Sequence, residues 1–157
     1  MFETLIAESE GPLGRFTLNR PEKLNPLSTE TLQELARAAR YFDERPEVKV
    51  VIVSGKGRAF SAGADLTSFS GSSNLSSREV GEIGRQMADA IEGMRALAIA
   101  EIQGWCVGGG LVLAAACDLR IVAESARFSI PEVDLGIPLA WGGIPRLVRE
   151  IGPAMTK

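Results

Sequence analysis

The chain has 157 residues, of which 45% are hydrophobic and 24% are charged, a composition typical of one globular domain spanning residues 1–157. A net charge of −3, without a block of lysines and arginines, argues against a nucleic-acid partner or a membrane surface. The sequence contains no histidine, which excludes a Ser-His-Asp triad and a histidine-ligated metal centre within it. We expect no metal site, and Cys106 and Cys117 lie in apolar stretches that favour a reduced, cytoplasmic protein.

The first third of the chain combines a hairpin, a helix and a strand. Residues 2–8 and 15–18 flank a Glu-Gly-Pro turn at 10–12, which predicts a β-hairpin. A helix is expected from residue 28 or 29 to 43, because apolar residues recur there at helical spacing behind a possible cap. Residues 48–54 are nearly all apolar, which is typical of a strand that is buried on both faces.

The rest of the chain continues to alternate strands with helices. Residues 68–77 are rich in serine and are expected to form a mobile loop, and Ser76 and Glu79 fit a capping box that opens a helix. Such alternation predicts an α/β domain with mainly parallel strands. Residues 151–157 are expected to contain no further element. The other expected elements are strands at 99–102, 119–122 and 128–130, a buried helix at 111–116 and a helix from 143 toward 149.

Two glycine-rich turns, at 60–66 and 104–110, are the strongest functional motifs in the chain. Glycine lets the backbone approach a ligand closely, and the first N–H groups of a following helix are free to donate. Converging turns of this kind would supply two amide donors for a developing oxyanion. A single turn of this kind is more often a site of tight packing than a catalytic amide, and neither turn fits a phosphate-binding loop or a dinucleotide fingerprint.

Two further motifs flank these turns, an Arg-Pro…Asn-Pro-Leu run at 20–27 and a Pro-Glu…Leu-Gly run at 131–136. In this order and spacing, the chain resembles the enoyl-CoA hydratase/isomerase (crotonase) family over essentially its whole length. The resemblance implies a spiral of repeated strand–strand–helix units, an acyl-coenzyme A substrate, no separate cofactor, and homotrimers or hexamers. Family members are longer, so we expect a short core without the C-terminal helices that complete their acyl pocket and trimer interface.

The resemblance also assigns roles to individual residues. It implies that the amides of Ala64 and Gly109 hold the thioester oxygen, where negative charge accumulates when a proton leaves the α-carbon. Glu132 corresponds to the family's later catalytic glutamate and would carry the proton. Asp65 is also placed to cap a helix, and Lys56 and Arg58 are cations that could meet phosphates or be solvated. The substrate-binding residues implied by the resemblance are Lys23, Leu24, Ala62, Ala64, Asp65, Leu66 and Gly109.

The chain departs from the hydratase pattern at one catalytic position. Hydratases of the family use two glutamates, and the earlier position corresponds here to Val112, which can neither hold nor activate water. A single carboxylate suits double-bond isomerisation, which is therefore favoured over hydration. Ala140 stands where dienoyl isomerases and related hydrolases place an aspartate, so those activities are not expected. Asp134 is expected to be a solvated turn residue, and Trp141 a packing residue that could line the acyl pocket.

A second hypothesis is a non-catalytic acyl-CoA-binding protein, or an incomplete relative that retains only the core of the family. In either case the absence of further helices would leave apolar surface exposed.

Overall fold

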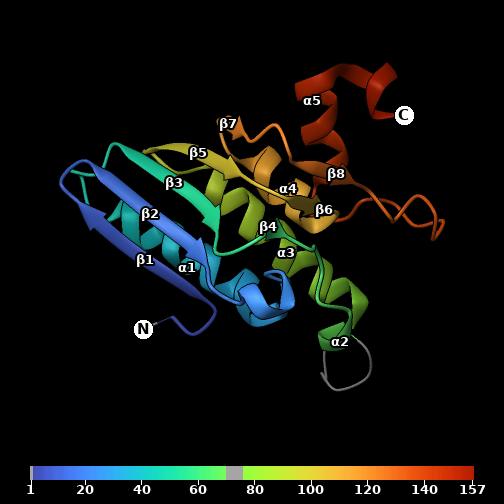
Figure 1. Cartoon of the computed structure of the whole chain (residues 1–157), viewed down its shortest axis with the longest axis horizontal. Helices are drawn as coiled ribbons and strands as arrows, with labels where there is room; N and C mark the ends of the chain where they lie inside the picture. Colours follow the sequence, from blue (N-terminus) through green and yellow to red (C-terminus); the bar gives the residue numbers. More distant parts are fainter. Residues whose placement is uncertain (1, 70–75) are drawn as a thin grey trace.

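The computed structural model describes residues 2–69 and 76–157, and their strands form two sheets (Figure 1). The larger sheet has five strands in the order β1-β2-β3-β5-β7. The β1–β2 hairpin is antiparallel, as predicted, and the remaining neighbours are parallel. These strands are β1 (Leu5–Glu10), β2 (Leu13–Leu18), β3 (Val50–Gly55), β5 (Leu97–Ile102) and β7 (Leu119–Val122).

The smaller sheet has three short parallel strands, β4 (Ala59–Ser61), β6 (Trp105–Val107) and β8 (Arg127–Ser129). Each follows a strand of the larger sheet, so that β3 leads to β4, β5 to β6 and β7 to β8. A helical segment follows each pair, which gives a repeated strand–strand–helix unit. This arrangement places the chain segments that leave β4, β6 and β8 next to one another.

The two longest helices in the described part of the chain begin at side-chain caps. The helices are η1 (Pro21–Lys23), α1 (Thr29–Asp43), α2 (Leu66–Phe69), α3 (Ser77–Glu92), α4 (Gly109–Ala116) and α5 (Gly143–Thr156). The Ser28 hydroxyl accepts a hydrogen bond from the Thr31 amide at 3.2 Å at the start of α1. The predicted capping box of α3 is present, since Ser76 and Glu79 each bond the other's backbone.

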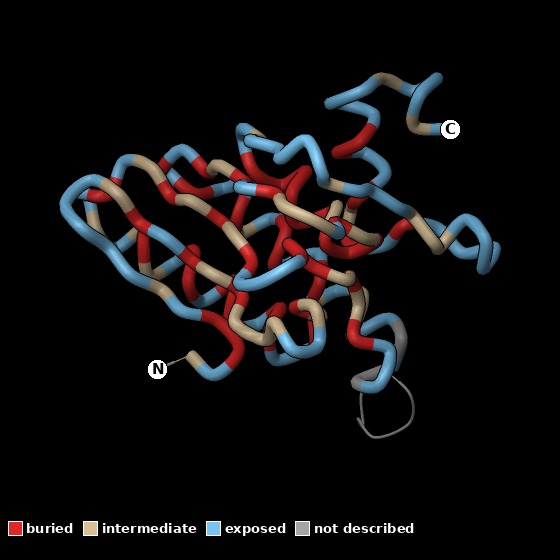
Figure 2. Tube along the Cα trace, viewed as in Figure 1, coloured by how far each residue is buried: buried red, intermediate tan, exposed pale blue. Residues whose placement is uncertain are grey.

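The core lies between the larger sheet and helices α1, α3 and α4, where buried residues are concentrated (Figure 2). Phe16 of β2 stacks on Phe42 of α1 with ring centroids 5.4 Å apart. Met87 and Ile91 of α3 are buried, as their helical spacing predicts. No helix in the described part of the chain combines the length and hydrophobicity that a membrane span requires.

Two expectations about the elements are wrong. In β3, Val51 and Val53 are buried but the alternate residues are only half-buried, because the core helices cover one face of this sheet (Figure 1). The last residues do form an element, since α5 continues to Thr156 across a kink at Gly152, where φ is 76°. The chain can kink here and continue as a helix because glycine adopts this backbone conformation without a side-chain clash.

The strands β4 and β6 were not predicted, because they overlap the glycine-rich segments that were interpreted as turns. The mobile loop expected at 68–77 falls largely on residues 70–75, which lie outside the described residues.

Candidate active site

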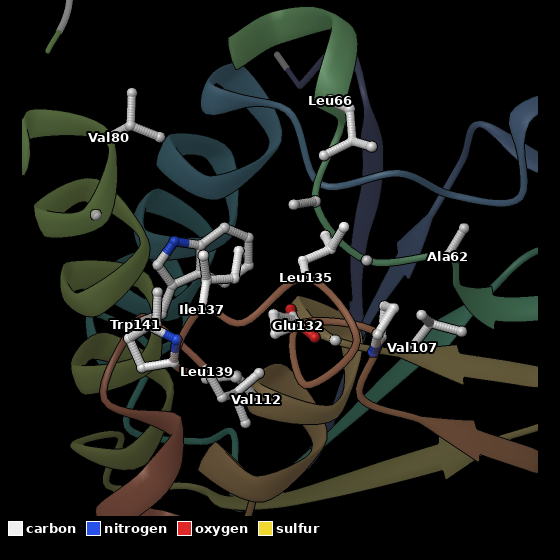
Figure 3. Close-up of a pocket in the computed structure, with 18 residues that line it drawn as sticks. Ala62, Leu66, Val80, Val107, Val112, Glu132, Leu135, Ile137, Leu139 and Trp141 are labelled. Carbon is white, nitrogen blue, oxygen red and sulfur yellow. The ribbon is translucent and has the colours of Figure 1, made fainter. Parts of the chain in front are cut away.

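A pocket with a volume of about 430 Å³ opens between the two glycine-rich turns, α3 and the loop that follows β8 (Figure 3). Its walls come from the turn after β4, the first turn of α4 and residues 131–141. The pocket is therefore assembled from all three strand–strand–helix units. Apart from one glutamate, the described side chains that line it carry no ionisable group.

The first turn directs one backbone amide into this pocket. Ala64 lies at a parallel bridge with Leu27, whose amide donates to the Gly63 carbonyl at 2.8 Å. The Asp65 amide donates back to the Leu27 carbonyl at 3.1 Å. Because neighbouring amides of an extended chain point to opposite sides, the Ala64 N–H points away from Leu27. It has no hydrogen-bond partner among the described residues, and Ala64 lines the pocket.

The second turn supplies another free amide. Gly108 adopts φ 48° and ψ −112°, and its N–H donates to the Ser129 carbonyl at 2.9 Å. Gly109 then begins α4, so its N–H has no acceptor within the helix, and no other partner occurs in the described part of the chain. The positive end of the helix dipole strengthens a donor at this position.

Backbone packing brings the two turns together. A Cβ atom built on Gly63 would lie 2.6 Å from the Val107 carbonyl oxygen and 3.5 Å from the Gly109 nitrogen. Real Cβ atoms do not approach a carbonyl so closely, and Gly63 also has a φ of 87°, which favours glycine. Glycine at this position therefore allows the chain after β4 to contact the chain after β6.

The carboxylate of Glu132 lies directly beside the second turn. A Cβ on Gly108 would be 2.5 Å from Glu132 Oε1, so the carboxylate occupies the space that a side chain there would need. Glu132 Oε2 is buried and has no hydrogen-bond partner among the described residues. A buried carboxylate oxygen without a donor is costly, and such a group in a pocket indicates a role toward a ligand.

The inner end of the pocket is apolar. Val112, Leu139 and Trp141 lie there with exposed fractions of 1%, 8% and 8% (Figure 3). Val112 has no polar atom in its side chain, so the position on α4 that could have carried a second carboxylate is hydrocarbon. The site thus combines two free amides, one carboxylate and an apolar wall.

Comparison with known proteins agrees with this arrangement. A model of the family described as "Enoyl-CoA hydratase/isomerase" matches residues 8–157. The chain belongs to this family. It is 40% identical to a crotonyl-CoA hydratase from Syntrophomonas wolfei, over 99% of this chain and 60% of that protein. It is 37% identical to a peroxisomal Delta(3,5)-Delta(2,4)-dienoyl-CoA isomerase from Arabidopsis thaliana, over 97% of this chain and 59% of that protein.

The solved structures confirm the predicted fold. The crystal structure of an enoyl-CoA hydratase/carnithine racemase from Magnetospirillum magneticum matches with a TM-score of 0.92 and 31% identity, over 99% of this chain and 60% of that one. The chain thus spans about 60% of the length of these relatives.

Three of the other residues expected to bind substrate lie on or beside the first turn. Ala62 and Leu66 line the pocket, and the Leu66 side chain at its rim is 72% exposed.

Asp65 points elsewhere, because its Oδ1 accepts hydrogen bonds from the Thr67 hydroxyl at 2.6 Å and the Thr67 amide at 3.2 Å. The Thr67 hydroxyl, helped by Arg20, lowers the pKa of Asp65 although burial opposes this. Asp65 therefore caps α2, one of the two roles expected for it in this family member.

Lys23 and Leu24 are not among the residues that line the pocket. Lys23 is exposed at the end of η1, and Leu24 contributes its carbonyl, which accepts from the Ala62 amide at 2.8 Å. This loop is held by Asn25 of the Asn-Pro-Leu run, to which sequence reasoning had assigned no role. Its side chain accepts from the Arg20 amide and donates to the carbonyls of Lys56 and Ala59.

The structure also adds a contact that sequence reasoning missed. Trp141 packs against Gly84 of α3, where a Cβ would lie 2.1 Å from the indole Cδ1. The only signal for this contact was the pair of glycines at 81 and 84, which share one face of an otherwise regular helix. No group of three or more potential metal-ligating side chains occurs within residues 2–69 and 76–157.

Proposed function

We propose that this protein acts on an acyl-coenzyme A thioester and moves a double bond along the acyl chain. The observation that carries the proposal is Glu132 Oε2, a buried carboxylate oxygen without a partner among the described residues, beside a turn with a free amide. A base needs such an unengaged oxygen within reach of the carbon that it deprotonates. The apolar surroundings suit an acyl chain better than a polar ligand.

The reaction balances with these groups alone. Glu132 takes a proton from the α-carbon of a 3-enoyl thioester, and the electrons of that C–H bond move toward the thioester oxygen. The amides of Ala64 and Gly109 hold the resulting negative charge, and losing one such donor typically costs about 3–4 kcal/mol of transition-state stabilisation. Glu132 then returns the proton to the γ-carbon, so the double bond moves next to the thioester. Coenzyme A is part of the substrate, and the proton transfer requires no separate cofactor.

Val112 supports isomerisation over hydration. A water molecule that adds to a double bond needs two to four polar partners to be held in place. Among the described lining residues, Glu132 is the only ionisable side chain, and the side chain of Val112 has no atom that could hydrogen-bond a water molecule next to α4. The relatives include a protein named as a crotonyl-CoA hydratase and one named as a dienoyl-CoA isomerase, so their names do not decide the reaction of this chain.

An acyl-CoA-binding protein without turnover is the second candidate. Leu66 and Leu135 at the pocket rim are 72% and 67% exposed, so one side of the pocket is open. An open pocket shields a developing charge less well from water and weakens electrostatic stabilisation.

Assays with a 3-enoyl-CoA and a 2-enoyl-CoA, run side by side on one sample, separate these functions. Isomerisation predicts conversion of the 3-enoyl substrate, with exchange of its α-protons in deuterated water. Rapid water addition that depends on Glu132 alone would contradict the preference for isomerisation. Calorimetric binding of a saturated acyl-CoA without turnover of either substrate would favour the binding protein.

We further propose that the protein is cytoplasmic and, at the relatives' full length, a homotrimer or hexamer. Burial raises the pKa of the Cys106 and Cys117 thiols to about 12, which suits structural thiols that stay reduced. The edge strand β7 exposes Ile121 at 64%, and α5 exposes Met155 at 76%. Exposed apolar surface of this kind marks contacts with other protein, and analytical ultracentrifugation tests the assembly.

A further inference from the structure

The indole of Trp141 bridges α3 and α4 at the inner end of the pocket (Figure 3). A Cβ on Gly84 of α3 would lie 2.1 Å from the indole Cδ1, and a Cβ on Gly109 of α4 would lie 2.1 Å from Cζ3. Both distances are far below van der Waals contact, so glycine at these two positions makes room for the ring. The six-membered ring therefore packs against the residue that supplies the second free amide.

The position of this indole is fixed by the chain around it. Trp141 has a φ of 58°, a left-handed conformation that is uncommon for a bulky residue and needs support from its surroundings. Arg146 of α5 supplies that support, because its Nη1 donates to the Trp141 carbonyl at 3.3 Å and the Gly142 carbonyl at 3.2 Å. Its Nη2 donates to Asp89 at 2.8 Å and Glu92 at 2.6 Å, both on α3.

The space in front of the ring is open. Gly81 lies one turn before Gly84 on α3 and lines the pocket, and a Cβ there would meet no atom within 4 Å. Behind this space, Val112 and Leu139 are buried beside the indole, so the ring completes a closed apolar end. An acyl chain that enters past Glu132 and continues inward would meet the indole face.

We infer that Trp141 determines the length of acyl chain that the pocket accepts, and that it restricts the inner end to short chains. The inference rests on the proposed acyl-CoA function and adds a specificity-determining residue to it. Each methylene that becomes buried raises affinity about fourfold, equivalent to about 0.8 kcal/mol. This gain stops where the chain reaches the ring.

The test is calorimetric binding of saturated butyryl-, octanoyl- and dodecanoyl-CoA, which requires no turnover. For the wild type we expect affinity to stop rising with chain length. Trp141→Ala vacates the space between α3 and α4, and we expect dodecanoyl-CoA to bind about tenfold or more tightly than to the wild type, with butyryl-CoA little changed. Gly81→Leu fills the open space instead, and we expect about a tenfold loss for octanoyl-CoA.

Trp105→Ala is the matched control, because Trp105 is 50% exposed on β6 and does not line the pocket. It should leave all three affinities unchanged. Trp141→Leu keeps a buried apolar side chain, and the same binding measurements are made on it if Trp141→Ala does not fold. Failure of the wild type to bind any of the three thioesters would contradict the proposed function itself. Binding whose chain-length dependence is the same in wild type and folded Trp141 variants would overturn the inference alone.

Discussion

Thr4 donates two hydrogen bonds to Glu34, one from its amide at 2.8 Å and one from its hydroxyl at 2.6 Å. The Glu3 amide adds a third at 2.7 Å, so the chain entering β1 is tied to a carboxylate of α1. Glu34 is only 1% exposed. Burial alone would raise the pKa of Glu34, but the hydrogen bonds from Thr4 and Glu3, with Arg37 nearby, outweigh it and hold the pKa below 4.5.

This arrangement predicts a pH-dependent contribution to stability. Because the pKa is lower in the folded state, the stabilisation is complete above the unfolded value near 4.5 and disappears as the pH falls through the folded value. Glu34→Gln should lower the free energy of unfolding at neutral pH by about 1–3 kcal/mol. The difference from the wild type should shrink in acid. Urea denaturation at several pH values measures it, with the exposed Glu30→Gln on the same helix as the control.

Glu132→Gln should abolish proton transfer while preserving binding. The amide has nearly the same shape but cannot accept the α-proton, and loss of a general base typically costs about 10²–10⁴-fold in rate. We expect kcat for isomerisation to fall within this range and the affinity for a saturated acyl-CoA to stay within a few-fold. Asp134→Asn, two residues along the same loop, is exposed and should retain full activity. Equal losses in the two variants would show that the loop, and not the base, was damaged.

Gly108→Ala should displace the Glu132 carboxylate. The new Cβ would lie 2.5 Å from Glu132 Oε1, at a backbone φ of 48°. Gly11→Ala in the β1–β2 turn is a matched control, because its φ is 53° but its Cβ would meet no atom within 4 Å. Gly11→Ala should lose about 1–2 kcal/mol of stability through backbone strain, and Gly108→Ala should lose more, because its ψ of −112° lies outside the left-handed region that other residues tolerate. Only the variant at 108 should lose turnover when both are assayed well below their melting temperatures.

Val112→Glu would place a second carboxylate beside α4. The site would then have two groups able to hold and activate a water, so addition of water to a 2-enoyl-CoA should increase above the wild-type rate. The same change buries a charge at a position that is 1% exposed, and we expect a marked loss in thermal stability. Val112→Gln has the same size and should not gain hydration. A folded Val112→Glu variant that binds acyl-CoA but adds no water would disprove this explanation of the reaction preference.

Arg146→Met should loosen the first turns of α5 and the pocket wall together. The guanidinium is buried, but Asp89 and Glu92 are 45% and 36% exposed, so the cost falls below that of a fully buried pair, at about 2 kcal/mol. Arg85→Met, which removes only the exposed pairs with Glu82 and Asp89, should change stability little. Differential scanning calorimetry at low and high salt compares the two. An identical melting temperature for both variants would contradict the structural role of Arg146.

The elements with a regular local pattern could be predicted from the sequence. The spacing of apolar residues and the caps at Ser28 and Ser76 gave α1 and α3 correctly, since these signals lie within a few residues of each other. The strands β4 and β6 were missed because they overlap the glycine-rich segments that were interpreted as turns, whereas the equally short β8 lies outside them and was expected at 128–130. The continuation of α5 beyond Gly152 was missed because glycine followed by proline usually ends a helix.

The candidate site depends on contacts between distant parts of the chain, which local patterns do not encode. The glycine-rich turns indicated close backbone approach, but only the folded chain shows that Gly108 makes room for Glu132 and Gly84 for Trp141. The position of Glu132 itself came from the family resemblance, because a glutamate after a strand has no distinguishing local signal. The roles of Lys23 and Leu24 remain predictions, since these residues lie outside the pocket wall.

The bridge between Leu27 and Ala64 has a consequence for how such a site can change over evolutionary time. Since both proposed oxyanion donors belong to the main chain, a change of side chain does not remove the donor atom unless the new residue is proline, although a side chain at Gly109 would also need room beside Trp141. Acidic groups at positions such as 112, 132 and 140 can be gained or lost one codon at a time without dismantling the anion-stabilising frame. New reactions on the same class of thioester can therefore arise by point mutation.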